Sequence, residues 1–151
     1  AKNTVKENIF FLSILRGLPK AEIEARLEEY RKYFPIYDSI HSKLFEELST
    51  GQKKLMTVLA ALVVDARYLL LDEPTEGLDL NHKIELTRVL NEIKKFKTLI
   101  ITSHDSEFVT DVSDTLLFLK DGKIIDISGR MDLETFTEKY ETYYLDERNR
   151  R

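Results

Sequence analysis

Residues 68–74 read Tyr-Leu-Leu-Leu-Asp-Glu-Pro, and this stretch decides the fold class. Its apolar run is short and continuous, which is typical of a strand buried on both faces of a parallel sheet. Asp72 and Glu73 follow directly. In an open parallel sheet, ligands bind outside the carboxyl ends of the strands, so both carboxylates are well placed for a functional role. A solvated turn is the alternative for Asp-Glu-Pro alone.

Neighbouring residues of a strand point to opposite sides, so Asp72 and Glu73 are predicted to perform different tasks. One suits Mg²⁺ held through water, and the other suits orienting or deprotonating a nucleophile. Residues 75–79, which read Thr-Glu-Gly-Leu-Asp, continue the pattern beyond the turn. The combination favours a functional site over a simple turn.

Strands alternate with helices after this stretch. An amphipathic helix is predicted to about Phe96, and a second buried strand follows over residues 98–102. The remaining elements are a short helix, a hairpin closed by an Asp-Gly turn and a final amphipathic helix, predicted near 108–112, over 116–128 and over 131–145. This alternation predicts an α/β fold with a parallel sheet flanked by helices.

The N-terminal side is predicted to be helical throughout. Three helices are expected, over residues 5–16, from Pro19 to Phe34 and from Ser49 onward. Capping boxes open the first and the third, because a hydroxyl and a carboxylate or amide stand three residues apart. Residues 36–48 are predicted to be irregular. We therefore predict a helical subdomain over residues 1–65, and the C-terminal part of an α/β core with a C-terminal helix over residues 66–151.

Composition excludes several classes of protein. The 151 residues suit one domain, and the absence of cysteine excludes disulfides, thiolate-bound zinc, iron–sulfur clusters and cysteine nucleophiles. A net charge of -4 gives no reason to expect nucleic-acid binding. The longest apolar run, residues 58–64, is far shorter than the roughly 20 residues that span a bilayer, and no cleavable signal is recognised. A cytosolic domain is expected.

Two further segments carry groups suited to phosphate. Residues 48–52, Leu-Ser-Thr-Gly-Gln, open a helix, where exposed amides, a hydroxyl and a glycine permit anion binding. An ordinary capping box is the alternative there. His104 follows the strand over 98–102 and suits donation to a phosphate or carboxylate. A histidine that is merely exposed is the alternative at that position.

In order and spacing, the segments Leu-Ser-Thr-Gly-Gln, Leu-Leu-Leu-Asp-Glu-Pro, Gly-Leu-Asp and Ser-His-Asp resemble the nucleotide-binding domain of ABC transporters. They lie at residues 48–52, 69–74, 77–79 and 103–105. Residues 4–9 resemble the start of that family's helical subdomain, and residues 116–128 resemble its strand pair. The resemblance implies a helical subdomain plus a partial RecA-like P-loop NTPase core.

The resemblance assigns four residues to the signature motif, which contacts ATP held by the opposite subunit: Ser49, Thr50, Gly51 and Gln52. Asp79 matches the D-loop, which touches that subunit. Two positions depart from the family's pattern, since Thr50 replaces a glycine and Glu76 replaces a serine. Both departures are expected to alter affinity or coupling without removing the site.

The same resemblance assigns the hydrolytic groups. Asp72 matches the Walker B aspartate on Mg²⁺, and Glu73 matches the catalytic carboxylate that polarises the attacking water. His104 matches the switch histidine near the γ-phosphate. ATP and Mg²⁺ are therefore the implied cofactors.

The sequence contains no P-loop. Only Gly122 precedes a lysine, but Leu117 stands where the first glycine belongs and Ile124 where the hydroxyl belongs. The resemblance covers the second half of the family's domain, so a missing N-terminal half with Walker A is an expected partner. The sequence is compatible with a truncated domain, a proteolytic remnant, part of a longer protein or half of a split protein.

The leading hypothesis is an ATP-hydrolysing subunit of an ABC transporter, peripheral at the cytoplasmic face of the membrane. Its expected partners are a second ATPase subunit in a head-to-tail dimer and transmembrane permease subunits. The isolated chain is predicted to be inactive, because nothing anchors the phosphates. Residues 16–22 resemble the corresponding segment in ATPases of exporters with separate membrane subunits, which implies export. The alternatives are a non-catalytic half-domain with a binding or regulatory role, and a soluble ABC-type ATPase without a transport role.

Overall fold

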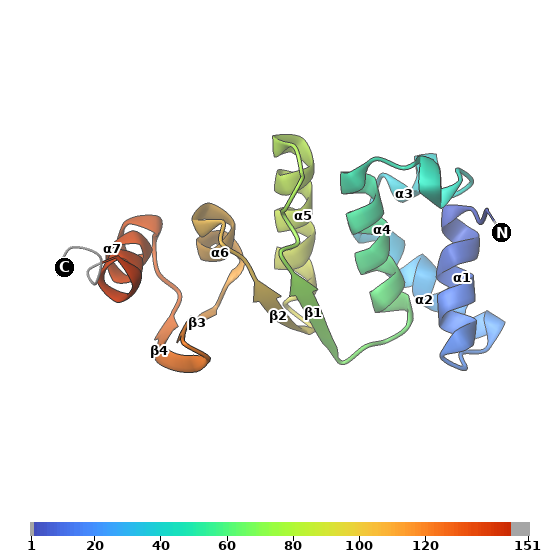
Figure 1. Ribbon diagram of the computed structural model, residues 1–151. Coiled ribbons are helices and arrows are strands. Elements are labelled where there is room, and N and C mark those ends of the chain that lie inside the picture. The colour runs from blue at the N-terminus through green and yellow to red at the C-terminus, as the bar shows by residue number, and fades with distance from the viewer. Residues whose placement is uncertain (1, 146–151) are drawn as a thin grey trace. The chain divides into compact units, whose positions relative to one another are not determined.

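The computed structural model describes residues 2–145 (Figure 1). The chain divides into two compact units, Ala1–Thr102 and Ser103–Arg151, and each is described by itself. The predicted boundary between residues 65 and 66 falls inside the first unit, so the assignment of 1–65 and 66–151 as domains stays a prediction. The ends of those ranges, residue 1 and residues 146–151, lie outside the described residues.

Helices form the N-terminal part of the first unit. They are α1 (Val5–Leu15), α2 (Lys20–Tyr30), α3 (Tyr37–Ile40) and α4 (Thr50–Val63), with short 3₁₀ turns η1 (Arg31–Tyr33) and η2 (Phe45–Glu47). The three long helices pack against one another (Figure 1). Their contact is made by apolar side chains at most 2% exposed, which include Ile9, Ile23, Leu55, Leu59 and Leu62.

Both predicted capping boxes are confirmed at the starts of helices. At α1, the Glu7 amide donates to Thr4 Oγ1 at 3.2 Å, and the Thr4 amide donates to Glu7 Oε2 at 2.7 Å. The prediction of irregular structure over 36–48 is wrong for α3 and η2. Tyr37 and Ile40 are 4% and 2% exposed, and one helical turn places both on the same side, where they reach the core.

A parallel strand pair completes the first unit. β1 (Tyr68–Asp72) pairs with β2 (Thr98–Thr102), with Asp72 opposite Thr102, and the crossover contains α5 (Leu80–Ile93). Buried side chains of α5 anchor this crossover: Leu86, Val89, Leu90 and Ile93.

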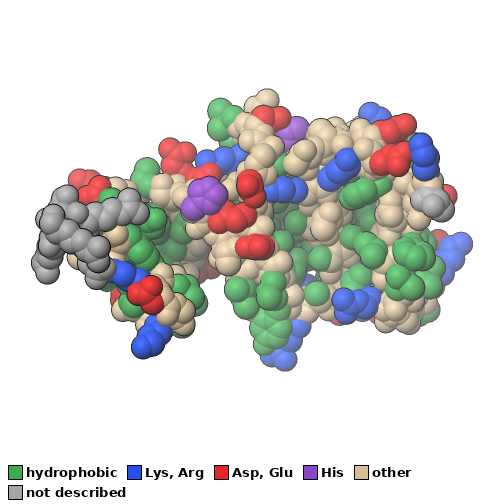
Figure 2. Space-filling model, viewed as in Figure 1, with side chains coloured by type: hydrophobic (Ala, Val, Ile, Leu, Met, Phe, Trp, Pro, Cys, Tyr) green, Lys and Arg blue, Asp and Glu red, His purple; other side chains and the backbone are tan. Residues whose placement is uncertain are grey.

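The prediction that β1 and β2 are buried on both faces is wrong for this chain. Exposure alternates along β1, where Leu69 is 3% exposed and Leu70 is 73% exposed, and Ile100 of β2 is 51% exposed. Figure 2 shows hydrophobic side chains uncovered on this part of the surface. A parallel sheet is buried on both faces only where helices cover both, and the described part of this unit covers one.

The second unit contains α6 (Ser106–Val112), the antiparallel strands β3 (Thr115–Lys120) and β4 (Lys123–Gly129), and α7 (Leu133–Tyr144). The predicted Asp-Gly turn is confirmed, because Asp121 and Gly122 have φ of 51° and 73°, as a tight hairpin requires. Phe118 of β3 is buried against α7, with its ring centroid 5.7 Å from that of Phe136. Among the described residues, no helix is long and apolar enough to cross a membrane.

Candidate functional site

The N-terminus of α4 carries the candidate signature residues. The Gln52 amide donates to Ser49 Oγ at 3.2 Å, and the Ser49 amide donates to Gln52 Oε1 at 3.1 Å. The local interpretation of this segment as a capping box is therefore confirmed. Ser49 and Thr50 are exposed. Their role in binding phosphate stays a prediction.

Gly51 is buried at this helix start for a reason that the sequence did not reveal. A β-carbon at Gly51 would lie only 2.2 Å from Cγ of His82, far inside van der Waals contact. The glycine thus lets the first turn of α4 pack on the first turn of α5. Packing between helices explains this glycine without any bound anion.

Asp79 and His82 form a fixed pair at the start of α5. Asp79 is the N-cap, and its carboxylate accepts from the His82 amide at 2.9 Å and pairs with His82 Nδ1 at 2.8 Å. These two hydrogen bonds lower the pKa of Asp79. His82 therefore lies against two predicted site residues, Asp79 and Gly51, although no motif in the sequence marks it. The sequence feature that could have identified His82 is its position three residues after an aspartate that caps a helix.

Asp72 and Glu73 lie at the carboxyl end of β1. Thr102, the last residue of β2, donates its hydroxyl to Asp72 Oδ1. The Glu73 amide donates to Thr102 O at 3.0 Å. Thr102 therefore organises both candidate carboxylate positions. It too was missed, because nothing local marks a threonine that becomes important through strand pairing.

The expectation that Asp72 and Glu73 alternate along the strand is wrong. β1 ends at Asp72, and Glu73 has a φ of 43°, in the left-handed region that residues other than glycine rarely adopt. Such conformations persist only where surrounding contacts enforce them, and they cluster at functional sites. The turn thus separates the two carboxylates by a change of backbone direction instead of by strand alternation.

His104 belongs to the second unit, just before the N-cap of α6. It is exposed. The neighbouring Asp105 caps α6, accepting from the Phe108 amide at 3.1 Å, and its own amide donates to Ser103 Oγ at 3.1 Å. The local chain around His104 is therefore ordered, and its role toward a phosphate stays a prediction.

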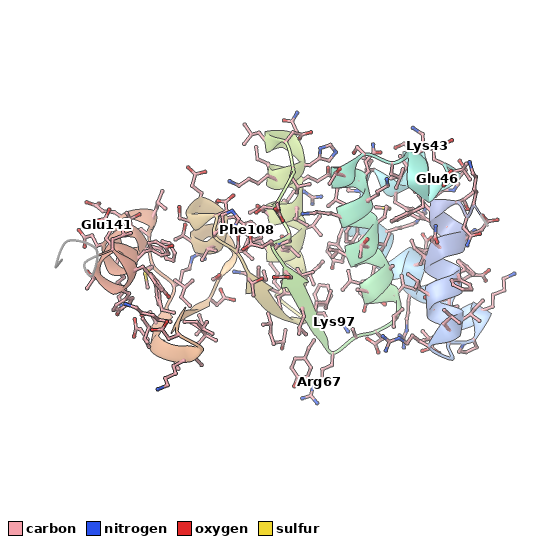
Figure 3. The ribbon with its side chains drawn as sticks, in the orientation of Figure 1. Lys43, Glu46, Arg67, Lys97, Phe108 and Glu141 are labelled. Atoms are coloured by element: carbon pink, nitrogen blue, oxygen red, sulfur yellow. The ribbon has the colours of Figure 1, made fainter. Side chains whose placement is uncertain are left out.

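Asp72 is exposed at the end of β1, and its role in holding Mg²⁺ stays a prediction. Across residues 2–145, no three histidine or carboxylate side chains converge as a ready-made metal site. Mg²⁺ is usually bound by only one or two carboxylates, together with waters and substrate phosphates, and an exposed carboxylate at a strand's carboxyl end fits that pattern. A hollow lined by Arg67 and Lys97 lies at the opposite, amino ends of the strands and takes no part in this site (Figure 3).

A parallel βαβ unit with two acidic residues at the end of its first strand, and a helix start packed on its crossover helix, defines a partial core of the RecA-like type. Residues 1–76 match the ABC transporter family, and the chain belongs to that family. The predicted fold class is confirmed.

Similar proteins include curated relatives and solved structures. The chain is 36% identical over 123 residues to the energy-coupling factor transporter ATP-binding protein EcfA of Methanocaldococcus jannaschii, covering 81% of this chain and 44% of that protein. It is 35% identical over 126 residues to the cobalt import ATP-binding protein CbiO of Salmonella typhimurium, covering 83% and 46%. Thus the chain spans less than half the length of both relatives.

The structure of cbiO1 from Clostridium perfringens, part of the transporter complex cbiONQ, matches with a TM-score of 0.77 and 30% identity, covering 97% of this chain and 60% of that one. The ADP conformation of the ATP-binding cassette MJ1267 also gives 0.77, at 22% identity, and supports the fold alone. None of these names supports the expectation of export.

Proposed function

We propose that this chain is part of the ATP-hydrolysing subunit of an ABC transporter and carries its signature and hydrolytic residues. The observation that supports this most directly is the turn after β1, where Thr102 contacts both Asp72 and the Glu73 backbone. The two carboxylates lie at the carboxyl ends of the parallel strands, where open sheets of this type commonly bind ligands. The family membership supplies the chemistry that such a pair performs.

Asp72 would hold Mg²⁺, which neutralises charge on the phosphates when bound. Glu73 would accept a hydrogen bond from the attacking water, orient it in line and take up its proton. The left-handed backbone conformation of Glu73 sets the direction in which its side chain leaves the backbone. His104, in the second unit, would donate to a γ-phosphate.

The start of α4 would act on a second nucleotide. Ser49, Thr50, Gly51 and Gln52 would contact ATP held by a second ATPase subunit in a head-to-tail dimer, and Asp79 would touch that subunit. The sequence has no P-loop, so the phosphate cradle must come from another segment, the N-terminal half of the same domain. Transmembrane permease subunits at the cytoplasmic face would complete the transporter, and the names of the cobalt import relatives favour uptake as its direction.

The test is Glu73→Gln in the complete subunit that contains this chain. The amide preserves shape but cannot take up a proton, so ATP turnover should fall by about 10²–10⁴-fold while ATP binding persists. Glu92→Gln, a partly exposed carboxylate on α5 paired with Lys95 at 2.7 Å, is the matched control and should retain turnover. Normal turnover in Glu73→Gln would overturn the assignment of the base. If the parent protein itself neither binds nor hydrolyses ATP, the chain is better explained as a non-catalytic module.

A further inference from the structure

Lys54 connects the helix of the signature segment to the turn that carries Glu73. It lies in the second turn of α4, and its Nζ donates to the backbone oxygen of Glu73 at 3.1 Å and to that of Glu76 at 2.6 Å. All these residues belong to the first unit. One ammonium group therefore holds both ends of a four-residue turn.

Together with other hydrogen bonds, the contacts of Lys54 hold both the amide and the carbonyl group of Glu73. The Glu73 amide donates to Thr102 O at 3.0 Å, and the Glu73 carbonyl accepts from the Glu76 amide at 3.1 Å as well as from Lys54. Glu73 has a φ of 43°, which requires enforcement by its surroundings. Thr102 supplies that enforcement from the neighbouring strand, and Lys54 supplies it from α4.

The adjacent Lys53 provides a natural comparison. Its Nζ donates to the backbone oxygen of Glu46 at 2.9 Å, on the segment that precedes α4. Two consecutive lysines of one helix therefore hold different segments. Only Lys54 reaches the turn that carries the candidate catalytic carboxylate.

We infer that Lys54 is a positioning residue, which fixes the turn 73–76 and thereby sets the location of the Glu73 carboxylate from the helix that begins at Ser49. The inference rests on the proposed function. An ammonium group is suited to this task because it has three donors and can serve two carbonyl oxygens at once. A movement of the start of α4 would be transmitted to Glu73 through this side chain.

The test compares Lys54→Met, Lys54→Arg and the control Lys53→Met in the complete subunit. Methionine keeps the apolar stem but has no donor, so kcat should fall about 10- to 100-fold with KM for ATP nearly unchanged, since displacement of a catalytic group by about 1 Å has effects of this size. Arginine retains donors and should restore much of kcat. Lys53→Met should behave as the parent protein.

A structural readout separates positioning from general stabilisation. Amide hydrogen exchange over residues 73–78 should become faster in Lys54→Met and not in Lys53→Met, while the helical circular dichroism of both stays that of the parent. If Lys54→Met does not fold, Lys54→Gln, which is too short to serve both carbonyls, takes its place under the same criteria. Equal kcat and equal exchange in the Lys54 and Lys53 variants would overturn the inference.

A double variant that combines Lys54→Met with Glu73→Gln distinguishes failure of this inference from failure of the proposed function. If Lys54 acts through Glu73, Lys54→Met should reduce turnover little further once Glu73 is already Gln, because the two changes affect one unit. Fully multiplicative losses would contradict action through Glu73. If Glu73→Gln itself leaves turnover intact, the proposed function fails, whatever Lys54 does to the turn.

Discussion

At the scale of single residues, His82 leaves no room for a β-carbon at Gly51. A β-carbon at Gly51 would meet three carbons of the His82 side chain at 2.2–2.7 Å, so α4 or α5 would have to move. Gly51→Ala should therefore destabilise the protein by about 1–3 kcal/mol, the usual cost of overpacking. Denaturant unfolding followed by circular dichroism would measure this change.

The partner substitution tests the cause of that loss. With His82→Gly, which removes all three clashing carbons, the space is free, so Gly51→Ala should cost much less in that background than in the parent. Gly129→Ala is the matched control, because nothing lies within 4 Å of a β-carbon there, and it should change stability by less than about 0.5 kcal/mol. If Gly51→Ala is equally costly with and without His82, the contact is not the reason for this glycine.

At the scale of elements, a network around Asp126 attaches β4 to α7. Asp126 Oδ2 accepts from Lys139 Nζ at 2.7 Å, from Ser128 Oγ at 2.7 Å and from the Tyr143 hydroxyl at 2.9 Å. Hydrogen bonds from Lys139, then Ser128 and Tyr143, hold the pKa of Asp126 far below its ordinary value of 3.8. The network is therefore complete while Asp126 is ionised.

This network predicts an acid-dependent loss of stability. Because the folded-state pKa is depressed, the stabilisation is fully present above the unfolded-state pKa and declines as the pH falls below it. Asp126→Asn should lower the melting temperature at about pH 6, and the difference from the parent should narrow at about pH 2.5. Asp111→Asn, an exposed carboxylate on α6, is the control. A difference that stays constant between the two pH values would contradict the role of the ionised carboxylate.

The elements were largely predictable, because their signals are local. Capping boxes at Thr4 and Ser49 marked helix starts, and the run after Arg67 marked a strand. The exposure of β1 was not predictable, because burial of a strand depends on what covers it. Nor was the left-handed Glu73 or its tie to Lys54, since a contact between residues 19 apart has no counterpart in local spacing.

At the scale of the whole molecule, the proposed function requires two subunits, since the residues at the start of α4 would serve a nucleotide that a second ATPase subunit holds. The structure shows Ser49 capping α4, and the proposed function adds a role in that contact. The two roles respond differently to substitution. Ser49→Ala removes the cap and should cost about 1 kcal/mol of stability. Under the proposed function, Ser49→Arg would place a bulky side chain where the opposing nucleotide docks.

Dimerisation of the complete subunit separates the two roles. In the Glu73→Gln background, ATP should not be consumed, so a stable dimer should accumulate and be visible by size-exclusion chromatography with light scattering. Adding Ser49→Arg should abolish this dimer while each subunit still binds ATP, because the phosphate cradle lies on another segment. Ser39→Arg, an exposed serine on α3, is the control for charge and bulk and should leave the dimer intact. Dimer formation that persists with Ser49→Arg would restrict Ser49 to capping α4.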